Sequence, residues 1–174
     1  MARITTVSES VVVNAPAADV YAKVSDPRNL GKWSPENTGA TLRQGDDGPA
    51  YVGMDFWGHN KRGPMKWATQ CIVTAADPGK RFAFRVVGQR FRGKERARLR
   101  FDIATWEYRL EEVEGGTRVT ETWVDDRSSS LFGRTSRMQD RIFTGGPSFP
   151  DLHSRNMKVT LQRLKAEIES GRGA

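Results

Sequence analysis

The feature that most constrains the fold is a succession of strand-length segments joined by very short turns. Segments rich in β-branched and aromatic residues lie at 7–13, 39–43, 50–59, 65–75, 81–87, 99–112 and 117–125. Turn formers such as Asp77-Pro78-Gly79 and Gly115-Gly116 follow several of them. Parallel crossovers need a dozen or more residues, so connections this short join antiparallel neighbours. The pattern predicts one large antiparallel sheet.

Helical patterns lie on both sides of the later strands. Asn14 or Ala15 is expected to cap a short helix that begins at Pro16 and ends at Asp26-Pro27, and a second short helix is expected at 27–32. A longer helix is predicted from about 150 to 169, with an apolar stripe formed by Leu152, Met157, Leu161, Leu164 and Ile168. A sheet with one apolar face and a helix with one apolar stripe cover each other. We therefore predict one α+β domain over residues 1–174, with a curved sheet around the last helix.

Composition narrows the class of protein. The chain has 174 residues, 37% hydrophobic and 28% charged, which is typical of a soluble domain with a sizeable core. It contains no apolar run of about 20 residues that could span a membrane, and its first residues lack the apolar region of a signal peptide. The single cysteine, Cys71, and two distant histidines favour neither a disulfide framework nor a metal site. We expect a cytoplasmic protein.

Strand alternation places a set of aromatic residues on one inner face of the sheet. That face also carries isolated polar residues, Asn60, Thr69 and Glu121. Glu121 is the most informative of them, because a carboxylate on an apolar face is costly unless it is hydrogen-bonded or neutralised. Two interpretations stay open: a structural anchor, or a polar group at the end of a ligand cavity.

Several motifs resemble a known family when taken in their order along the chain. They are Trp33-Ser34-Pro35-Glu36, FWGHNKRG at 56–63, PGKRFAF at 78–84, ATWEY at 104–108 and GTRVTETW at 116–123. Together they resemble the polyketide cyclase/dehydrase branch of the START-like, or SRPBCC, superfamily over nearly the whole chain. The resemblance implies a helix-grip fold, in which a seven-stranded antiparallel sheet curls round the last helix. It also implies two short helices after the first strand and a cavity between sheet and helix.

The resemblance also sets expectations about function. Members of the superfamily bind lipids, sterols, polyketides, hormones or quinones, and the characterised aromatic cyclases use no cofactor. We therefore expect a small hydrophobic, ring-bearing, polyketide- or lipid-like ligand and no cofactor. The alternative is a cofactor-independent polyketide cyclase or dehydratase, because fold alone does not fix chemistry.

The candidate site combines residues from loop, strand and helix. Glu121 and Asn60 are the candidate catalytic residues, because a carboxyl group near an amide can polarise a carbonyl or move a proton in an aldol-type closure. The other interpretation is a hydrogen-bond network that locks the helix onto the sheet. His153 is a candidate acid–base group, or simply a partly buried residue at the helix start. The candidate ligand-binding residues are Trp33, Glu36, Phe56, Trp67, Phe84, Trp106, Tyr108, Trp123, His153, Asn156 and Met157.

Three features lie outside this site. The net charge of +7 is concentrated in a basic hairpin at 89–100, where like charges would face each other. Either an anionic partner relieves them, or the hairpin is simply extended and solvated. An anionic partner gives a third hypothesis, an interaction protein, although no nucleic-acid motif supports binding to nucleic acid. Trp57 should point outward, as a candidate homodimer contact, and His59 should face solvent. The segment 127–146 is predicted to form a mobile cover at the cavity mouth.

Overall fold

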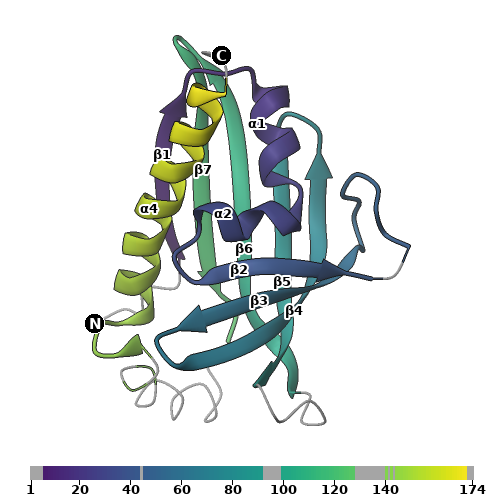
Figure 1. Cartoon of the computed structure of the whole chain (residues 1–174), viewed down its shortest axis with the longest axis vertical. Helices are drawn as coiled ribbons and strands as arrows, with labels where there is room; N and C mark the ends of the chain where they lie inside the picture. The colour runs from purple at the N-terminus through teal and green to yellow at the C-terminus, as the bar shows by residue number, and fades with distance from the viewer. Residues whose placement is uncertain are drawn as a thin grey trace.

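Seven antiparallel strands form a single sheet in the order β1-β7-β6-β5-β4-β3-β2. The structure is a computed structural model that describes residues 6–43, 45–91, 99–127, 140, 142 and 144–171. The strands are β1 (Thr6–Val13), β2 (Asn37–Leu42), β3 (Asp55–Arg62), β4 (Met65–Asp77), β5 (Arg81–Phe91), β6 (Leu99–Val113) and β7 (Gly116–Asp125). The helices are α1 (Ala17–Val24), the 3-10 turn η1 (Pro27–Asn29), α2 (Leu30–Trp33) and α4 (Phe149–Ser170) (Figure 1).

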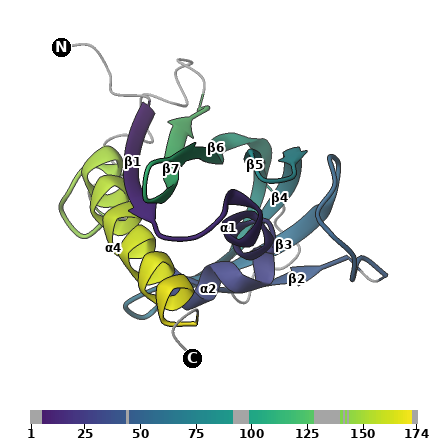
Figure 2. The ribbon, with the colours of Figure 1, turned by 90° about the horizontal axis from the view of Figure 1, so that it is seen from above.

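The sheet curls strongly, and α4 closes its open side. Seen from above, the strands follow an arc from β1 round to β2, and α4 runs beside β1 towards α2 (Figure 2). Register shifts at Gln70/Cys71 and Val73/Ala75 in the β4–β5 pair, and at Val86/Gly88 in the β5–β6 pair, support this curvature, because β-bulges bend a strand. The predicted helix-grip architecture, with short helices after the first strand, is confirmed.

The core fills the space between the inner face of the sheet and α4. Phe82, Val119 and Leu164 are completely buried there, and the predicted stripe of α4 is buried along its length at Leu152, Met157, Leu161, Leu164 and Ile168. α4 begins after Ser148, whose hydroxyl oxygen accepts a hydrogen bond from the backbone N–H of Asp151. Alternation along the strands therefore predicted the inner face correctly for β5, β6 and β7.

Two of the element starts that differ from the sequence-based expectation have a clear physical reason. α1 begins at Ala17, because Pro16 has an extended ψ of 147° and is the capping residue rather than the first helical one. β3 begins at Asp55 instead of residue 50. Gly53 has a φ of +95°, a turn conformation, and Val52 before it is exposed, so strand alternation cannot extend through them.

The outward face of β3 and β4 is more covered than alternation predicts. Gln70 lies on this face yet is buried, and its amide donates a hydrogen bond to Asp55 at 2.8 Å. Trp57 points outward as expected but is half-buried, with the Arg90 guanidinium 4.2 Å from its ring centroid. His59 is half-buried beside the Thr41 hydroxyl. A homodimer contact through Trp57 stays a prediction.

Two predicted features fall on residues that the structure does not describe. Gln89 pairs with Leu99, which is the register expected for a basic hairpin with a three-residue loop. The tip of that hairpin, 92–98, lies outside the described residues, and so does most of the predicted cover at 127–146. Neither the anionic partner nor the mobile cover is tested.

Candidate functional site

Glu121 and Tyr108 form a buried polar pair on the inner face of the sheet. The two residues lie opposite each other in the β6–β7 register, and the Tyr108 hydroxyl donates a 2.8 Å hydrogen bond to Glu121 Oε1. Glu121 is 4% exposed. Its other oxygen, Oε2, is buried without a hydrogen-bond partner among the described residues. Burying a polar atom without such a partner is unfavourable.

Burial also sets the charge state of this pair. Burial raises the pKa of the Glu121 carboxyl to about 8, although the hydrogen bond from Tyr108 opposes the shift. Burial and the adjacent Glu121 carboxyl raise the pKa of Tyr108 well above its usual value, so its hydroxyl keeps its proton and remains a donor. Near neutral pH, Glu121 is therefore mainly a neutral acid that can donate a proton or a hydrogen bond.

An aromatic cluster centred on His153 lies next to the polar pair. The His153 ring is 4.6 Å from the Trp123 ring, 5.1 Å from Trp106 and 5.6 Å from Phe149 (centroid distances). Trp123 is two residues from Glu121 on the same face of β7, a separation of about 7 Å along the strand. A flat apolar wall therefore continues directly from the Glu121 carboxyl towards the start of α4.

His153 is held neutral in this cluster. Burial, followed by the positive charges of Arg62 and Arg127, lowers the pKa of the His153 imidazole to about 3. The ring thus carries no charge near neutral pH. An acid–base role that depends on titration near neutrality, which the sequence allowed, does not fit these surroundings. The contacts of His153 suit an apolar wall instead.

Glu36 belongs to a separate ion pair at the end of β3. Both of its carboxylate oxygens accept hydrogen bonds from Arg62, at 2.5 and 2.9 Å. The Arg62 guanidinium also lies 5.3 Å from the centroid of the Trp67 ring. Sequence reasoning missed Arg62. Arg62 could have been found from its position at the end of a strand, because it is two residues after Asn60 and so lies on the same face.

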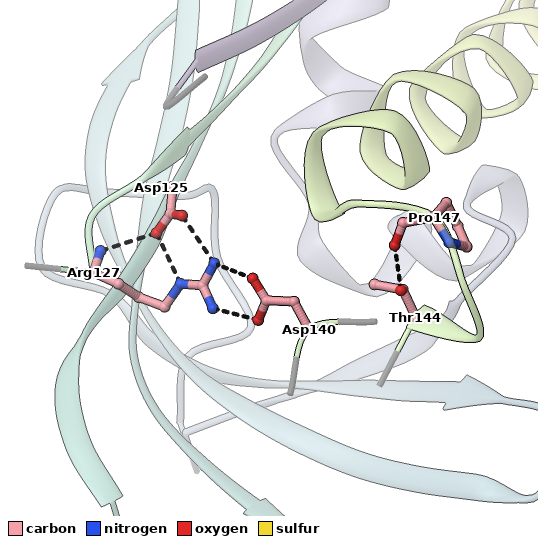
Figure 3. Close-up of polar contacts among 5 residues, drawn as sticks. All are labelled: Asp125, Arg127, Asp140, Thr144 and Pro147. Atoms are coloured by element: carbon pink, nitrogen blue, oxygen red, sulfur yellow. Dashed lines mark hydrogen bonds and ion pairs between the residues drawn. The ribbon is translucent and has the colours of Figure 1, made fainter. Parts of the chain in front are cut away.

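Arg127 is a second residue that sequence reasoning missed. It lies between the carboxylates of Asp125 and Asp140, with hydrogen bonds of 2.9–3.2 Å (Figure 3). Its guanidinium is also 5.2 Å from the centroid of the Phe149 ring. Although burial opposes the charge, these hydrogen bonds raise the pKa of Arg127. The network joins the end of β7 to the residues before α4, and so positions Phe149 and His153.

The remaining predicted residues lie at the end of β3, in the core or on α4. Asn60 is half-buried at the end of β3, where its amide donates to Gly58 O and the Thr69 hydroxyl. Trp33 is buried, and its indole N–H donates to Glu167 of α4 at 2.6 Å. Phe56 and Phe84 are buried in the core, where their rings make an edge-to-face contact. Met157 is also buried there, beside Trp123. Asn156 is half-buried on α4.

These positions divide the predicted site. The structure brings Trp106, Trp123, His153 and Met157 together beside the Glu121–Tyr108 pair. Glu121, Asn60 and Glu36 make their hydrogen bonds to different partners instead of to one another. Groups of three or more His, Cys, Asp or Glu side chains that could hold a metal ion do not occur among the described residues. No helix in that part of the chain is long and apolar enough to cross a membrane.

Comparisons with known proteins agree with this fold. Three solved structures are similar to the chain. A polyketide cyclase-like protein from Corynebacterium glutamicum is 25% identical, with a TM-score of 0.55, and the match covers 94% of this chain and 91% of that one. A Mycobacterium smegmatis protein is 20% identical (TM-score 0.63, coverage 96% and 92%), and a putative protein in the dynemicin biosynthetic locus is 18% identical (TM-score 0.57, coverage 97% and 49%). No curated protein matches the chain. The family model described as polyketide cyclase / dehydrase and lipid transport matches residues 5–169. The chain therefore belongs to the polyketide cyclase / dehydrase and lipid transport family.

Proposed function

We propose that the protein binds a small hydrophobic, ring-bearing ligand between the inner face of the sheet and α4. The observation that carries the proposal is the buried Glu121 Oε2, which has no hydrogen-bond partner in the described part of the chain. A polar group of the ligand would supply that partner. Trp106, Trp123 and His153 would supply flat apolar walls, which suit rings. Family membership supports a ligand of this class.

The ligand would have to enter by displacing side chains. Glu121 is buried, so solvent does not reach its carboxyl group in this conformation. Four nearby side chains are only half-buried: Trp67, Trp106, His153 and Asn156. Trp106 lies next to the Glu121–Tyr108 pair, and His153 and Asn156 lie in the first half of α4. Rotation of these side chains would open a route from solvent to Oε2. Binding should therefore quench the fluorescence of these tryptophans.

Calorimetric titration with 2-acetylnaphthalene tests the proposal. We expect saturable binding to the wild-type protein and weaker binding to Glu121→Leu, which leaves the ligand carbonyl without a partner. Glu111→Leu is the matched control, because Glu111 is exposed on the outward face of the adjacent β6 strand. Loss of binding in both variants, or in neither, would count against an interior site at Glu121.

A second candidate function is cofactor-independent cyclisation. It is favoured by one observation: burial raises the pKa of Glu121 to about 8, which lets the carboxyl group exchange a proton near neutral pH. Glu121 would act as the acid–base group, and Asn60 would polarise a substrate carbonyl after leaving Thr69. With a short poly-β-ketone thioester as substrate, Glu121→Gln should abolish turnover while affinity is retained. Equal turnover in this variant would exclude Glu121 as the acid–base group.

A further inference from the structure

The hydrogen bond between Tyr108 and Glu121 restricts what the interior can recognise. A phenol hydroxyl has a single proton to donate, and Tyr108 gives it to Glu121 Oε1. The ligand is therefore left with Oε2. If Glu121 is ionised, Oε2 accepts hydrogen bonds only; if it is protonated there, Oε2 donates one. The surroundings of the carboxyl group decide between these two states.

Burial favours the protonated state of Glu121, and the hydrogen bond from Tyr108 opposes it. From β6 it faces Tyr108, a neutral donor. From β1 it faces Glu9, its partner in the β1–β7 register, so the two side chains lie on one face with Cβ atoms about 5 Å apart. From α4 come Lys158 and Ser154, which already contact Glu9 at 3.6 and 2.6 Å, and the neutral His153. None of these contacts reaches Glu121 Oε2, which has no hydrogen-bond partner among the described residues.

The nearby arginines do not change this balance. Arg62 is bound by the carboxylate of Glu36, and Arg127 lies between Asp125 and Asp140. An anionic ligand group at Oε2 would therefore face carboxyl groups, and would be buried without a matching cation. Burial of an unmatched charge is strongly unfavourable.

We infer that the interior selects a neutral, ring-bearing carbonyl compound, whose oxygen accepts a hydrogen bond from the protonated Oε2 of Glu121. This inference rests on the proposed function and adds the class of ligand. It also makes binding depend on pH, because an ionised Glu121 would point a lone pair at the carbonyl oxygen. Burial raises the pKa of Glu121 to about 8, so the change falls in an accessible range.

Three probes of nearly equal shape test the inference by calorimetry. They are 2-acetylnaphthalene, with a carbonyl acceptor, 2-isopropenylnaphthalene, in which C=CH₂ replaces C=O, and the anion 2-naphthoate. At about pH 6 the ketone should bind about five- to tenfold more tightly than the isopropenyl compound, as one net hydrogen bond allows. 2-Naphthoate should bind no more tightly than the isopropenyl compound. At about pH 9.5 the advantage of the ketone should disappear.

Variants separate Glu121 from other pH effects. Glu121→Gln keeps an N–H donor that does not titrate, so the ketone should keep its advantage at both pH values. Glu111→Gln, on the exposed face of β6, should behave as the wild type does. A ketone advantage that persists at about pH 9.5 in the wild type, or a preference for 2-naphthoate, overturns the inference but not ligand binding. Failure of all three probes to bind overturns the proposed function and the inference with it.

Discussion

Glu121 is the residue at which sequence and structure point most directly to function. A strand pattern put a carboxyl group on an apolar face, and the fold gives it one hydrogen bond from Tyr108 and no partner for Oε2 among the described residues. Proteins tolerate such a group when it is neutral, because desolvation penalises the charged form. Its cost should therefore appear as a dependence of stability on pH.

We expect Glu121→Gln to remove part of that dependence. Burial raises the folded-state pKa of Glu121 to about 8 from its usual 4.5, so the folded state binds the proton more tightly than the unfolded state. The corresponding stability is present below about pH 4.5 and is lost as the pH rises to about 8. Urea unfolding should show the wild type losing a few kcal/mol relative to Glu121→Gln between about pH 5 and 9, since one pKa unit corresponds to about 1.4 kcal/mol. Parallel pH curves for the two proteins would contradict this.

His153 should have the opposite dependence. Burial, with the charges of Arg62 and Arg127, lowers the folded-state pKa of His153 to about 3 from 6.5, so the unfolded state binds the proton more tightly. The stability is present above about pH 6.5 and is lost as the pH falls. His153→Phe keeps a ring beside Trp106 and Trp123 but cannot take up a proton. Urea unfolding at about pH 7 and pH 4 should show the wild type losing about 3 kcal/mol more than His153→Phe. An equal loss would show that His153 titrates normally.

At the scale of elements, α4 is held on the sheet by an apolar stripe with polar contacts at its edges. Glu167 accepts the indole N–H of Trp33, Lys165 donates to the Val12 carbonyl, and Glu169 accepts the backbone N–H of Asn14. These contacts lie in the C-terminal half of the helix. They fix that half to α2 and β1, while the half that carries His153 lies beside the candidate site.

The stripe should provide most of the stability of this packing. Leu164 is completely buried, and Leu164→Ala should cost about 2–5 kcal/mol, because it removes buried methyl groups and leaves a cavity. Gln162→Ala is the matched control, since Gln162 is exposed two residues away and should change stability by less than about 0.5 kcal/mol. Chemical unfolding measures both. A cost below about 1 kcal/mol for Leu164→Ala would mean that α4 contributes little to the core.

Elements were predictable from sequence to the extent that their signals are local. Turn residues and alternation located the strands, and helical spacing located α4, because each depends on neighbours within a few residues. The burial of Gln70 and the partners of Glu36 were not predictable. They depend on Asp55 and Arg62, which only the curvature of the sheet and its pairing bring near. For the Glu121–Tyr108 hydrogen bond, the sequence predicted only that both side chains point inward. It did not predict that they lie opposite each other, because the register between β6 and β7 depends on contacts beyond the local sequence.

For the whole molecule, the important contact is the pairing of the first strand with the last. β1 pairs with β7 along its length, from Thr6–Val124 to Val13–Thr117, so the sheet is complete only when its first and last strands meet. α4 then covers β1 and closes the curl. The two strands are far apart in sequence, and pairing of such strands is typically slow to form. The junction where β1 ends and β7 begins is therefore the place where a local change should affect the whole fold.

Gly116 lies at that junction, and Gly116→Ala should destabilise the whole molecule. Its φ is +134°, and an added Cβ would lie 2.1 Å from the Val13 carbonyl oxygen, which is backbone and cannot rotate away. Strain and overpacking together should cost about 3 kcal/mol or more. Gly115→Ala is the matched control, because Gly115 also has a positive φ, +85°, but open space around its Cβ position, and should cost only about 1–2 kcal/mol. Urea unfolding followed by tryptophan fluorescence compares the two, and equal costs would mean that the approach of β1 to β7 does not limit stability.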